Sequence, residues 1–443
     1  MRPGLTELRI SASEIFDATL RAVDAGAAVR SAVKFAEGHF TVCGRPIDTS
    51  NVSAVAIGKA ALAMGEALEQ SLGQFFKQGV LTGPAPSLAQ TKWLSASRWN
   101  WYVGGHPLPN RESLSAAADA VGLLQKANRD RGVVIFLISG GGSAMMEWPA
   151  APNITLSDLQ GANRTLVSCG ASISEVNSVR RAFSAIKGGK LAARAPECDQ
   201  ITLVLSDVPK NEEFNVASGP SIDPNHGHPV AVDVIESYKL RTHLPATIVE
   251  AVENPRDFHL TSETSRERFV LLSNDDAIQS AAAAAKQRGF LVDVATDIVD
   301  GPISAGCDIL SQRFANLRAQ AGDAPVCLIS GGEFACPVSG EGVGGRNLET
   351  ALRLAMQNGS AASDFVGLCA GTDGIDGNSP AAGAIADSST VDRARAGGYD
   401  PEDYLQRSDA YSFFAELGDT IITGPTGTNV RDLRILLSRS IKR

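Results

Sequence analysis

The sequence lacks the features that mark proteins bound to nucleic acid or inserted in membranes. It carries 40 Lys and Arg against 49 Asp and Glu, a net charge of −9. A protein that binds along a duplex needs an excess of basic side chains to neutralise phosphates, so we expect no nucleic-acid partner. Apolar runs such as VVIFLI are far shorter than the roughly 20 residues that span a bilayer. We therefore expect no membrane segment.

Paired cysteines are also lacking. The seven cysteines are scattered without a C-x-x-C pair, and most lie in apolar runs. This pattern favours buried free thiols in a reducing compartment over disulfides or a zinc site. The first residues, MRPGLTELRISASEIF, are interrupted by charges and contain no signal-peptide core. We expect a soluble, cytoplasmic protein, and the sequence leaves a homodimer open.

Aromatic residues are few, at 6%, whereas 44% of the residues are hydrophobic and 43 are glycine. This composition is typical of an alanine-rich α/β protein. A chain of 443 residues is too long for one ordinary core, so two domains are expected. We place the first at residues 1–265 and the second at 266–425, with the tail 426–443 packing back on the first.

Three buried-type strands in the first half are each followed by polar or glycine residues. Residues 52–57 precede Gly58 and Lys59, residues 133–139 precede three glycines, and residues 201–205 precede Ser206 and Asp207. The carboxyl ends of strands in an open α/β sheet are where such proteins bind ligands. Lys59 also stands at the start of a helix, where a cation is electrostatically unfavourable. These positions are therefore site candidates.

A second candidate site lies between residues 327 and 387. We expect a short strand that ends in Ser330-Gly331-Gly332-Glu333, a second short strand, and a glycine-dense loop before Arg346 at a helix start. The next strand, 365–369, runs into Gly371-Thr372-Asp373-Gly374. Glycines beside a helix N-terminus let backbone N–H groups approach a phosphate. Because Ser-Gly-Gly also follows the strand at 133–139, we expect two related cradles for phosphate or carboxylate.

Basic residues gather between the two stretches. Arg180 and Lys187 are seven residues apart, so they should share one face of a helix. Alone, this pattern is more typical of a solvated face than of a site. His106, within Gly-His-Pro, is equally open to a structural or a ligand-binding role.

Together these motifs resemble the type II glycerate kinase (MOFRL) family, whose members are also often labelled hydroxypyruvate reductases. The resemblance is collinear and spans nearly the whole chain. Its motifs are GKAA from Gly58, GHP from Gly105, LISGGGSA from Leu137, IKGG from Ile186, SDVP from Ser206, ASGP from Ala217, SGGE from Ser330, GGRN from Gly344, TDGIDG from Thr372 and TGPTGTN from Thr423.

The resemblance implies a two-domain α/β kinase. Its first domain would be Rossmann-like and doubly wound, its second a smaller α/β domain, with the active site in the cleft. The reaction implied is phosphorylation of D-glycerate, or a close small anionic hydroxy acid, to 2-phosphoglycerate with ATP and Mg²⁺.

The family pattern and the residue chemistry together give candidate roles. Phosphoryl transfer needs positioning and charge neutralisation, which suits Lys59, Asp207 and Arg346 as the catalytic centre. Carboxylates suit Mg²⁺, and the candidates are Glu333, Asp373 and Asp376. The substrate-binding candidates are His106, Ser139, Gly140, Gly141, Gly142, Ser143, Arg180 and Lys187. The nucleotide-binding candidates are Gly331, Gly332, Gly344, Gly345, Thr372 and Asn429.

The chain departs from the family pattern at two places near these candidates. Ala182 and Phe183 replace a usual His-Leu, and Lys210 replaces a glycine after Ser206-Asp207-Val208-Pro209. We expect an acceptor pocket that is more basic near one wall and more apolar near the other. An anionic hydroxy acid of three or four carbons fits that expectation, unless both changes point away from the pocket.

Two other classes of function compete with a kinase. Gly340 to Gly345 matches G-x-G-x-x-G, which would suit an NAD(P)-dependent hydroxypyruvate reductase. The segment before it, however, looks like a hairpin rather than the first strand of a βαβ unit. A non-catalytic sugar-acid sensor is the third class, and the presence of Lys59, Asp207 and Arg346 together argues against it.

Overall fold

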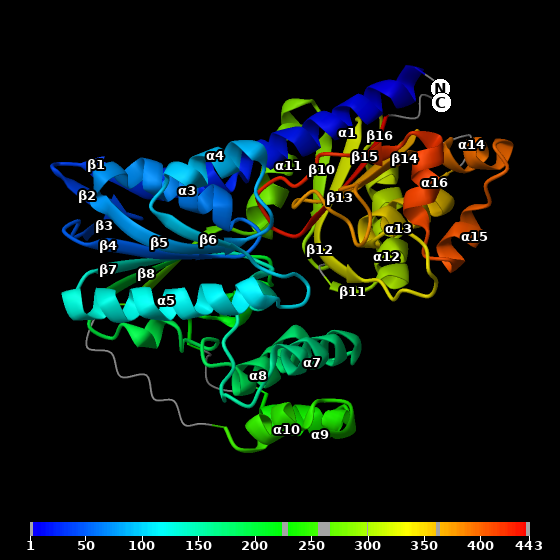
Figure 1. Ribbon diagram of the computed structural model, residues 1–443. Helices are drawn as coiled ribbons and strands as arrows, with labels where there is room; N and C mark the ends of the chain where they lie inside the picture. The colour runs from blue at the N-terminus through cyan, green and yellow to red at the C-terminus, as the bar shows by residue number, and fades with distance from the viewer. Residues whose placement is uncertain (1–2, 224–228, 256–265, 299, 360–363, 440–443) are drawn as a thin grey trace. The chain divides into compact units, whose positions relative to one another are not determined.

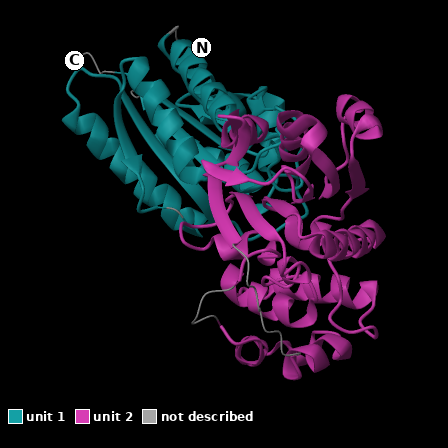
Figure 2. Cartoon of the chain, turned by 90° about the vertical axis from the view of Figure 1, so that its left-hand side faces the viewer, with its two compact units in different colours: residues 1–24, 272–443 teal, residues 25–271 magenta. Residues whose placement is uncertain are grey.

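The computed structural model describes residues 3–223, 229–255, 266–298, 300–359 and 364–439 (Figure 1). The chain divides into two compact units, unit 1 with residues 1–24 and 272–443 and unit 2 with residues 25–271 (Figure 2). The sequence predicts domains of 1–265 and 266–425 with the tail on the first. In the structure, helix α1 (Pro3–Ala22) packs on α11 (Asn274–Gln287), and strand β16 (Asp432–Ser438) joins the sheet of unit 1.

Unit 2 is built on a six-stranded sheet with the order β6-β5-β4-β7-β8-β9. The strands from β6 to β8 pair in parallel, which is the order and direction of a doubly wound Rossmann-like fold. This confirms the expected fold of the first domain. Strands β4 and β7 are buried at every position, as strands covered on both faces must be. The bounds are β4 Val52–Ile57, β5 Phe76–Gly83, β6 Trp99–Val103, β7 Val133–Ile138, β8 Asp199–Leu205 and β9 Arg266–Leu272.

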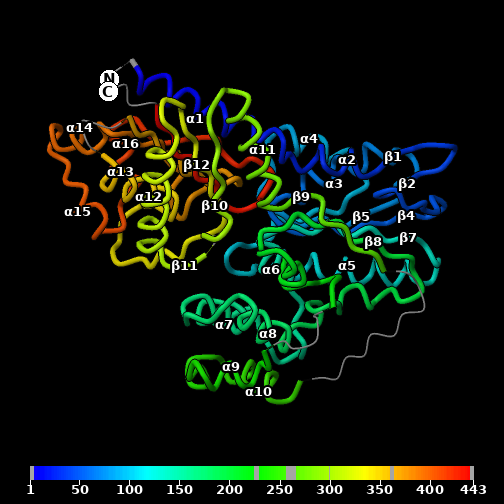
Figure 3. Tube along the Cα trace, turned by 180° about the vertical axis from the view of Figure 1, so that it is seen from behind, coloured from blue at the N-terminus to red at the C-terminus, as the bar shows by residue number. Residues whose placement is uncertain are grey.

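Helices of unit 2 pack against this sheet or form a separate group. Helices α7 to α10 surround a hydrophobic core of their own and lie together in the trace (Figure 3). A small antiparallel sheet, β1 to β3, follows α2. The bounds are α2 Ala25–Ala32, β1 Val33–Ala36, β2 His39–Val42, β3 Arg45–Ile47, α3 Ala61–Leu72, α4 Leu88–Ala96, α5 Arg111–Asp130, α6 Gly142–Met145, α7 Leu156–Ser168, α8 Ile173–Phe183, α9 Ala231–Ser237 and α10 Ala246–Glu253.

Unit 1 is built on a mixed sheet with the strand order β10-β12-β16-β13-β14-β15, and β11 pairs with β12. Helices α1 and α11 cover one face, and α12 and α13 cover the other, so each face has its own hydrophobic core. The smaller second α/β domain is thereby confirmed. The bounds are β10 Leu291–Ala295, β11 Asp300–Pro302, α12 Ile303–Gln320, β12 Val326–Ala335, α13 Arg346–Asn358, β13 Phe365–Gly371, β14 Gly383–Asp387, α14 Thr390–Ala396, α15 Pro401–Gln406, α16 Ala410–Leu417 and β15 Thr420–Ile421.

Strand β12 corrects one expectation about unit 1. The sequence predicts a turn at Ser330-Gly331-Gly332-Glu333 and then a second strand, but β12 continues through these residues to Ala335. The prediction of a second cradle-forming turn is therefore wrong. The cause is pairing with two other strands. Residues Val326 to Gly332 pair with β16, and residues Glu333 to Ala335 pair with β11.

Two features of the structure concern the state of the cysteines and the possibility of a membrane-spanning helix. All seven cysteines are free thiols, and Cys198, Cys307, Cys327 and Cys369 are buried. Burial raises the pKa of the Cys327 and Cys369 thiols. Among the residues that the structure describes, no helix is both long enough and apolar enough to cross a membrane.

The close approach of α11 to β12 gives a test of this packing. A Cβ at Gly331 would overlap Oδ1 of Asn274 and lie 2.7 Å from Cδ1 of Ile278, so Gly331→Ala should destabilise the protein by about 1–3 kcal/mol. The control is Gly122→Ala in α5, where nothing lies within 4 Å of the added methyl and stability should rise by up to about 1 kcal/mol. Urea unfolding would measure both, and equal stability of the two variants would contradict the packing.

Candidate functional site

The candidate site of unit 2 lies at one edge of the parallel sheet. Ile57, Ile138 and Val204 are level with one another in the paired strands β4, β7 and β8. Lys59, Gly140 and Asp207 follow these strands within three residues of those positions. The structure thus brings to one edge the three loops that the sequence singled out separately.

The loops after β4 and β7 interlock through their backbones. The Lys59 N–H donates to the carbonyl of Gly140 at 2.9 Å, and the Ala60 N–H donates to Oγ of Ser139 at 3.1 Å. Gly58 has φ of 117°, and a Cβ there would lie 2.7 Å from the Gly140 carbonyl oxygen. Glycine is therefore required at position 58. Ser139 holds the start of α3 instead of standing open to a ligand.

Lys59 and His106 lie beside the glycine turn. Gly141 is the N-cap of α6 and has φ of 79°. A Cβ there would be 3.0 Å from Cγ of Lys59 and 3.3 Å from Cδ2 of His106. Gly142 packs against Ala217, and a Cβ at Gly142 would lie 2.7 Å from Cβ of Ala217. The structure therefore brings Lys59, His106 and Gly141 together, although their positions are up to 82 residues apart in sequence.

A hydrogen-bonded chain connects Ser143 with Arg180. Ser143 Oγ bonds Ser218 Oγ, which donates to Oδ1 of Asn177 at 2.8 Å. Arg180 donates to the same Asn177 oxygen at 3.4 Å and to Oδ1 of Asn163 at 3.0 Å. Burial lowers the pKa of Arg180 to about 10, with Glu147 opposing the shift. The hydrogen bonds described for this buried guanidinium go to neutral amide oxygens.

Lys187 has a different environment from the one predicted. Helix α8 ends at Phe183 and Ser184 is extended, because Ser184 forms a bridge to Pro149. The expectation that Arg180 and Lys187 share one helical face is therefore wrong. Lys187 forms a fully buried ion pair with Glu147, and Glu147 also accepts from Oγ of Ser184 at 2.6 Å. Burial lowers the pKa of Lys187, while Glu147 opposes that shift.

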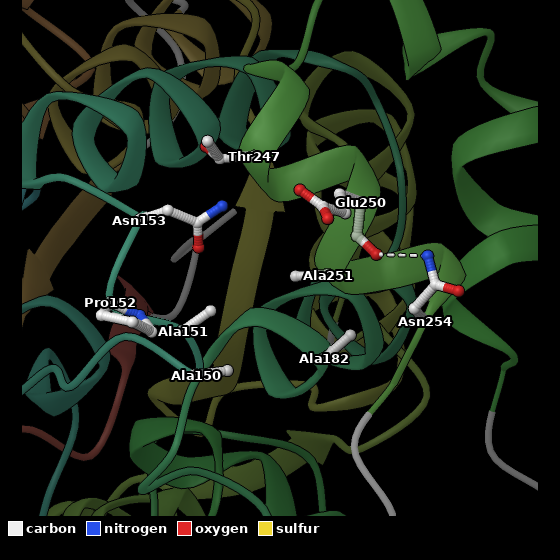
Figure 4. A pocket seen from close by; sticks show the side chains of 9 residues that line it. All are labelled: Ala150, Ala151, Pro152, Asn153, Ala182, Thr247, Glu250, Ala251 and Asn254. Atoms are coloured by element: carbon white, nitrogen blue, oxygen red, sulfur yellow. Dashed lines mark hydrogen bonds between the residues drawn. The ribbon is translucent and has the colours of Figure 1, made fainter.

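The positions that depart from the family pattern fall in unlike environments. Phe183 is fully buried in the core of α7 to α10, and Lys210 is exposed beyond β8. Ala182 lines a cavity of about 260 Å³ together with Thr247, Glu250 and other residues (Figure 4). Half-buried Asp207 follows β8 directly, and Ser206 supports the loop by donating to the Val208 carbonyl at 3.2 Å.

In unit 1, the centre of the candidate site is Arg346, the first residue of α13. Its Nε and Nη2 contact the two carboxylate oxygens of Asp432 at 2.6 Å and 3.3 Å. Nη2 also lies 2.8 Å from Oε1 of Glu333. Burial opposes the charge, but Asp432 and Glu333 outweigh it and raise the pKa of Arg346. The guanidinium is thus held in one orientation by two carboxylates.

Asp376 occupies the N-terminus of α13. Its carboxylate accepts from the N–H groups of Asn347 at 3.1 Å and Leu348 at 2.8 Å. A Cβ at Gly345 would lie 2.5 Å from Oδ1 of Asp376, so this carboxylate needs a glycine there. Unpaired N–H groups at a helix start attract anions. Here those of Asn347 and Leu348 bind an aspartate of the protein itself, which leaves them unavailable to a phosphate.

The other nucleotide-binding candidates are also held by internal contacts. The Gly332 N–H donates to Oδ1 of Asn274 at 2.8 Å. The hydroxyl of buried Thr372 donates to the Arg431 carbonyl at 2.7 Å and accepts from the Val430 N–H at 2.9 Å. Asn429 is buried, and its Oδ1 accepts from the Arg431 N–H at 3.4 Å. These contacts join β12, β13 and the loop before β16 at one end of the sheet.

The three carboxylates proposed for a metal are not gathered. Glu333 pairs with Arg346, Asp376 caps α13, and Asp373 accepts from the Ile375 N–H at 3.3 Å. Throughout the described ranges, no group of three His, Cys, Asp or Glu side chains is placed to hold a metal ion. A metal bound entirely by protein side chains is therefore not supported.

Sequence reasoning missed several residues that organise these sites. Asp432, Glu147, Asn177 and Ser218 all bond to predicted residues, yet none was named as a site residue. Ser218 lies in the ASGP motif, which was a usable signal. Asp432 stands before the strand residues Leu433 to Leu437, which are apolar except for Arg434. Nothing local shows that Arg346, 86 residues earlier, is its partner.

Comparisons with known proteins give the class of this protein. Residues 11–253 match a domain of unknown function (DUF4147), and residues 326–432 match the MOFRL family. D-glycerate 2-kinase of Thermotoga maritima is 34% identical over 88% of this chain and 91% of its own. A protein of Agrobacterium vitis with the provisional name hydroxypyruvate reductase is 34% identical over 86% of this chain and 98% of its own.

A solved structure agrees with these relatives. The crystal structure of glycerate kinase from Thermotoga maritima has a TM-score of 0.79 at 30% identity, covering 98% of this chain and 100% of the other. The fold and the comparisons define a two-domain α/β kinase. The chain belongs to the type II glycerate kinase (MOFRL) family.

The Lys187–Glu147 pair gives a test that separates stability from binding. Lys187→Met leaves a buried carboxylate without its cation, which should cost about 3–5 kcal/mol of stability, whereas the double variant Glu147→Leu/Lys187→Met should recover most of the loss. Urea unfolding measures both. A variant Lys187→Met with unchanged stability and a raised KM for glycerate would instead make Lys187 a substrate ligand.

Because the carboxyl group of Asp376 is buried, we expect the stability of the protein to depend on pH. Burial raises its pKa from 3.8 to about 7, with Asp432 adding to the shift and the Leu348 N–H opposing it. Between about pH 4 and about pH 7, the folded protein therefore binds more protons than the unfolded chain. The contribution of Asp376 to the free energy of unfolding is full below about pH 4 and is lost as the pH rises through about 7. Relative to wild type, Asp376→Asn should become steadily more stable from about pH 4 to about pH 8. A Tm difference that is constant with pH would contradict this.

Proposed function

We propose that this protein is a glycerate 2-kinase that transfers the γ-phosphoryl group of ATP to D-glycerate, with Mg²⁺, to give 2-phosphoglycerate. The observation that carries the proposal is the meeting of Lys59, the glycine turn and Asp207 at one edge of the parallel sheet. The names of the family's relatives, glycerate kinase and D-glycerate 2-kinase, support the substrate.

Lys59 and Asp207 have complementary roles in this proposal. Phosphoryl transfer is accelerated mainly by positioning and by neutralising charge on the transferred group. Lys59 supplies a cation whose stem lies over the Gly141 turn, and it would neutralise the phosphoryl oxygens. Asp207 would orient the attacking hydroxyl and accept its proton.

Arg180 is the best candidate to bind the carboxylate of glycerate. Its charge is buried against the amide oxygens of Asn163 and Asn177, and a buried cation needs an anionic partner. A substrate carboxylate would supply one through paired N–H···O bonds. Ser143 belongs to the same hydrogen-bonded chain through Ser218 and would bind a hydroxyl group of the substrate. His106 would contact the substrate from beside Gly141.

Arg346 would bind phosphate oxygens of the nucleotide through its guanidinium. The N-terminus of α13 is already capped by Asp376, so the Arg346 guanidinium rather than backbone N–H groups would meet the nucleotide. Gly344 and Gly345 then act by allowing close packing, and Thr372 and Asn429 by holding the neighbouring loops.

The donor set fits Mg²⁺ held mostly by phosphates. This ion commonly keeps several waters and takes only one or two carboxylates together with phosphate oxygens. Asp373 comes two residues after the carboxyl end of β13, and such strand ends are where α/β sheets bind ligands. We assign half-buried Asp373 as the protein ligand. The ion would supply neutralising charge on the phosphate oxygens.

The structure does not favour the reductase alternative. The G-x-G-x-x-G segment at Gly340 packs against the chain near Arg407 and Asp409. A Cβ at Gly340 would lie 2.6 Å from the Arg407 carbonyl carbon, and one at Gly342 would lie 2.5 Å from Cβ of Asp409. These glycines therefore serve internal packing, whereas a dinucleotide fingerprint leaves its turn open to a pyrophosphate.

A coupled assay tests the proposal against the alternative. With Mg-ATP and D-glycerate, the protein should release ADP and 2-phosphoglycerate, and it should not consume NADH or NADPH with hydroxypyruvate. Reduction of hydroxypyruvate without ADP release would replace the kinase with the reductase. Erythronate, threonate and tartronate, assayed beside glycerate, would define the acceptor class.

Asp207→Asn and Lys59→Met are the variants that test the catalytic roles. Asp207→Asn keeps the shape but removes the proton acceptor, so kcat should fall by at least about a hundredfold while ATP still binds. Lys59→Met should lower kcat by a similar factor with little change in Tm. Lys126→Met, an exposed lysine on α5, is the matched control and should retain wild-type kinetics. Normal kcat in either site variant would remove that residue from the mechanism.

A further inference from the structure

A buried carboxylate stands at the start of the central strand of unit 1. Asp432 is the first residue of β16 and is 2% exposed. It pairs in register with Gly332 of β12 on one side and with Gly371 of β13 on the other. A Cβ at Gly371 would lie 3.5 Å from Oδ1 of Asp432. This carboxylate therefore lies in the middle of the sheet, between two glycine-bearing strands.

Arg346 is the cationic partner of Asp432. The bonds of 2.6 Å and 3.3 Å join two guanidinium nitrogens to the two carboxylate oxygens. Such paired bonds fix the plane of the guanidinium as well as its distance. Glu333, at 2.8 Å from Nη2, adds a partly exposed contact. Asp432 is therefore the buried side of the arrangement, and Glu333 is at its rim.

The place of Arg346 in its helix needs an explanation. A cation in the first turn of a helix is disfavoured by the helix dipole. Its two carboxylates offset this cost and keep the charge on the guanidinium, whose pKa they raise. A buried ion pair is often no more stabilising than apolar residues of similar size. Stability alone thus does not account for a bidentate pair at this position.

We propose that Asp432 is a positioning residue that holds the Arg346 guanidinium in the orientation required for phosphoryl transfer. The inference rests on the proposed kinase function. Asp432 would touch neither substrate nor nucleotide and would act only through Arg346. Loss of its charge should therefore leave binding nearly unchanged and slow the chemical step, because a misaligned guanidinium no longer matches the transition state.

A double-mutant cycle tests this. Asp432→Asn should lower kcat by at least about tenfold, with KM for glycerate and ATP within about threefold of wild type. In the Arg346→Lys background, Asp432→Asn should lower kcat by no more than about twofold further, since the residue through which it acts is already changed. A kcat of Asp432→Asn within about twofold of wild type, or losses that multiply, would overturn the proposal.

Asp387→Asn is the matched control. Asp387 is also a fully buried carboxylate of unit 1, paired with Arg9 at 2.7 Å. It pairs with Val366 at the start of β13, whereas Asp432 pairs with Gly371 at the end of that strand. Asp387→Asn should lower Tm without lowering kcat at a temperature where the variant is folded. An equal loss of kcat in both variants would reduce the role of Asp432 to stability and overturn the proposal.

A measurement without turnover separates this inference from the proposed function. In protein labelled with nitrogen isotope at arginine, the Nε–Hε signal of Arg346, assigned through Arg346→Lys, should exchange slowly with water. The signal should exchange rapidly in Asp432→Asn. Absence of ADP release by wild type would refute the kinase function, whereas unchanged exchange in Asp432→Asn would refute the positioning role of Asp432.

Discussion

The parallel pairing of β4, β7 and β8 is the constraint on which the candidate chemistry of unit 2 depends. Parallel strands end at the same edge, so loops far apart in sequence meet there. The backbone bond from Lys59 to Gly140 then locks two of the loops together. Side chains with long stems, such as Lys59, are thereby presented from a fixed base, which is what a reaction based on positioning and charge neutralisation requires.

The tripeptide Ser-Gly-Gly has two different backbone structures in this chain, and only the fold distinguishes them. Ser139-Gly140-Gly141 turns after β7, as the sequence predicts, whereas Ser330-Gly331-Gly332 stays within β12. The difference comes from β16, which pairs with β12 from about a hundred residues further along. Local patterns gave the buried strands and the family resemblance, and the resemblance in turn implied the doubly wound first domain. They could not give a strand pairing that depends on a distant partner.

Charged residues show a similar limit. Lys59, Asp207 and Arg346 were singled out from their places beside strands and helices, and each lies where that reading puts it. The spacing predicts that Lys187 shares a helical face with Arg180, but the helix ends at Phe183 and Glu147 is the buried partner of Lys187. The glycines before Arg346 predict a helix N-terminus open to phosphate, but Asp376 accepts from the N–H groups of Asn347 and Leu348 there. In both cases the partner is remote in sequence, so spacing alone cannot reveal it.

The central place of β16 also has a consequence for the synthesis of the protein. In the sheet as described, β16 lies between β12 and β13 and pairs with both. It follows unit 2 and the other described strands of unit 1 in the chain. Because domains generally fold as units during translation, unit 2 can complete its sheet while β16 is still inside the ribosome. Helix α1, although made first, must wait for strands made last. During that interval its apolar face, with Leu5, Leu8 and Phe16, stays uncovered by β13 and β16.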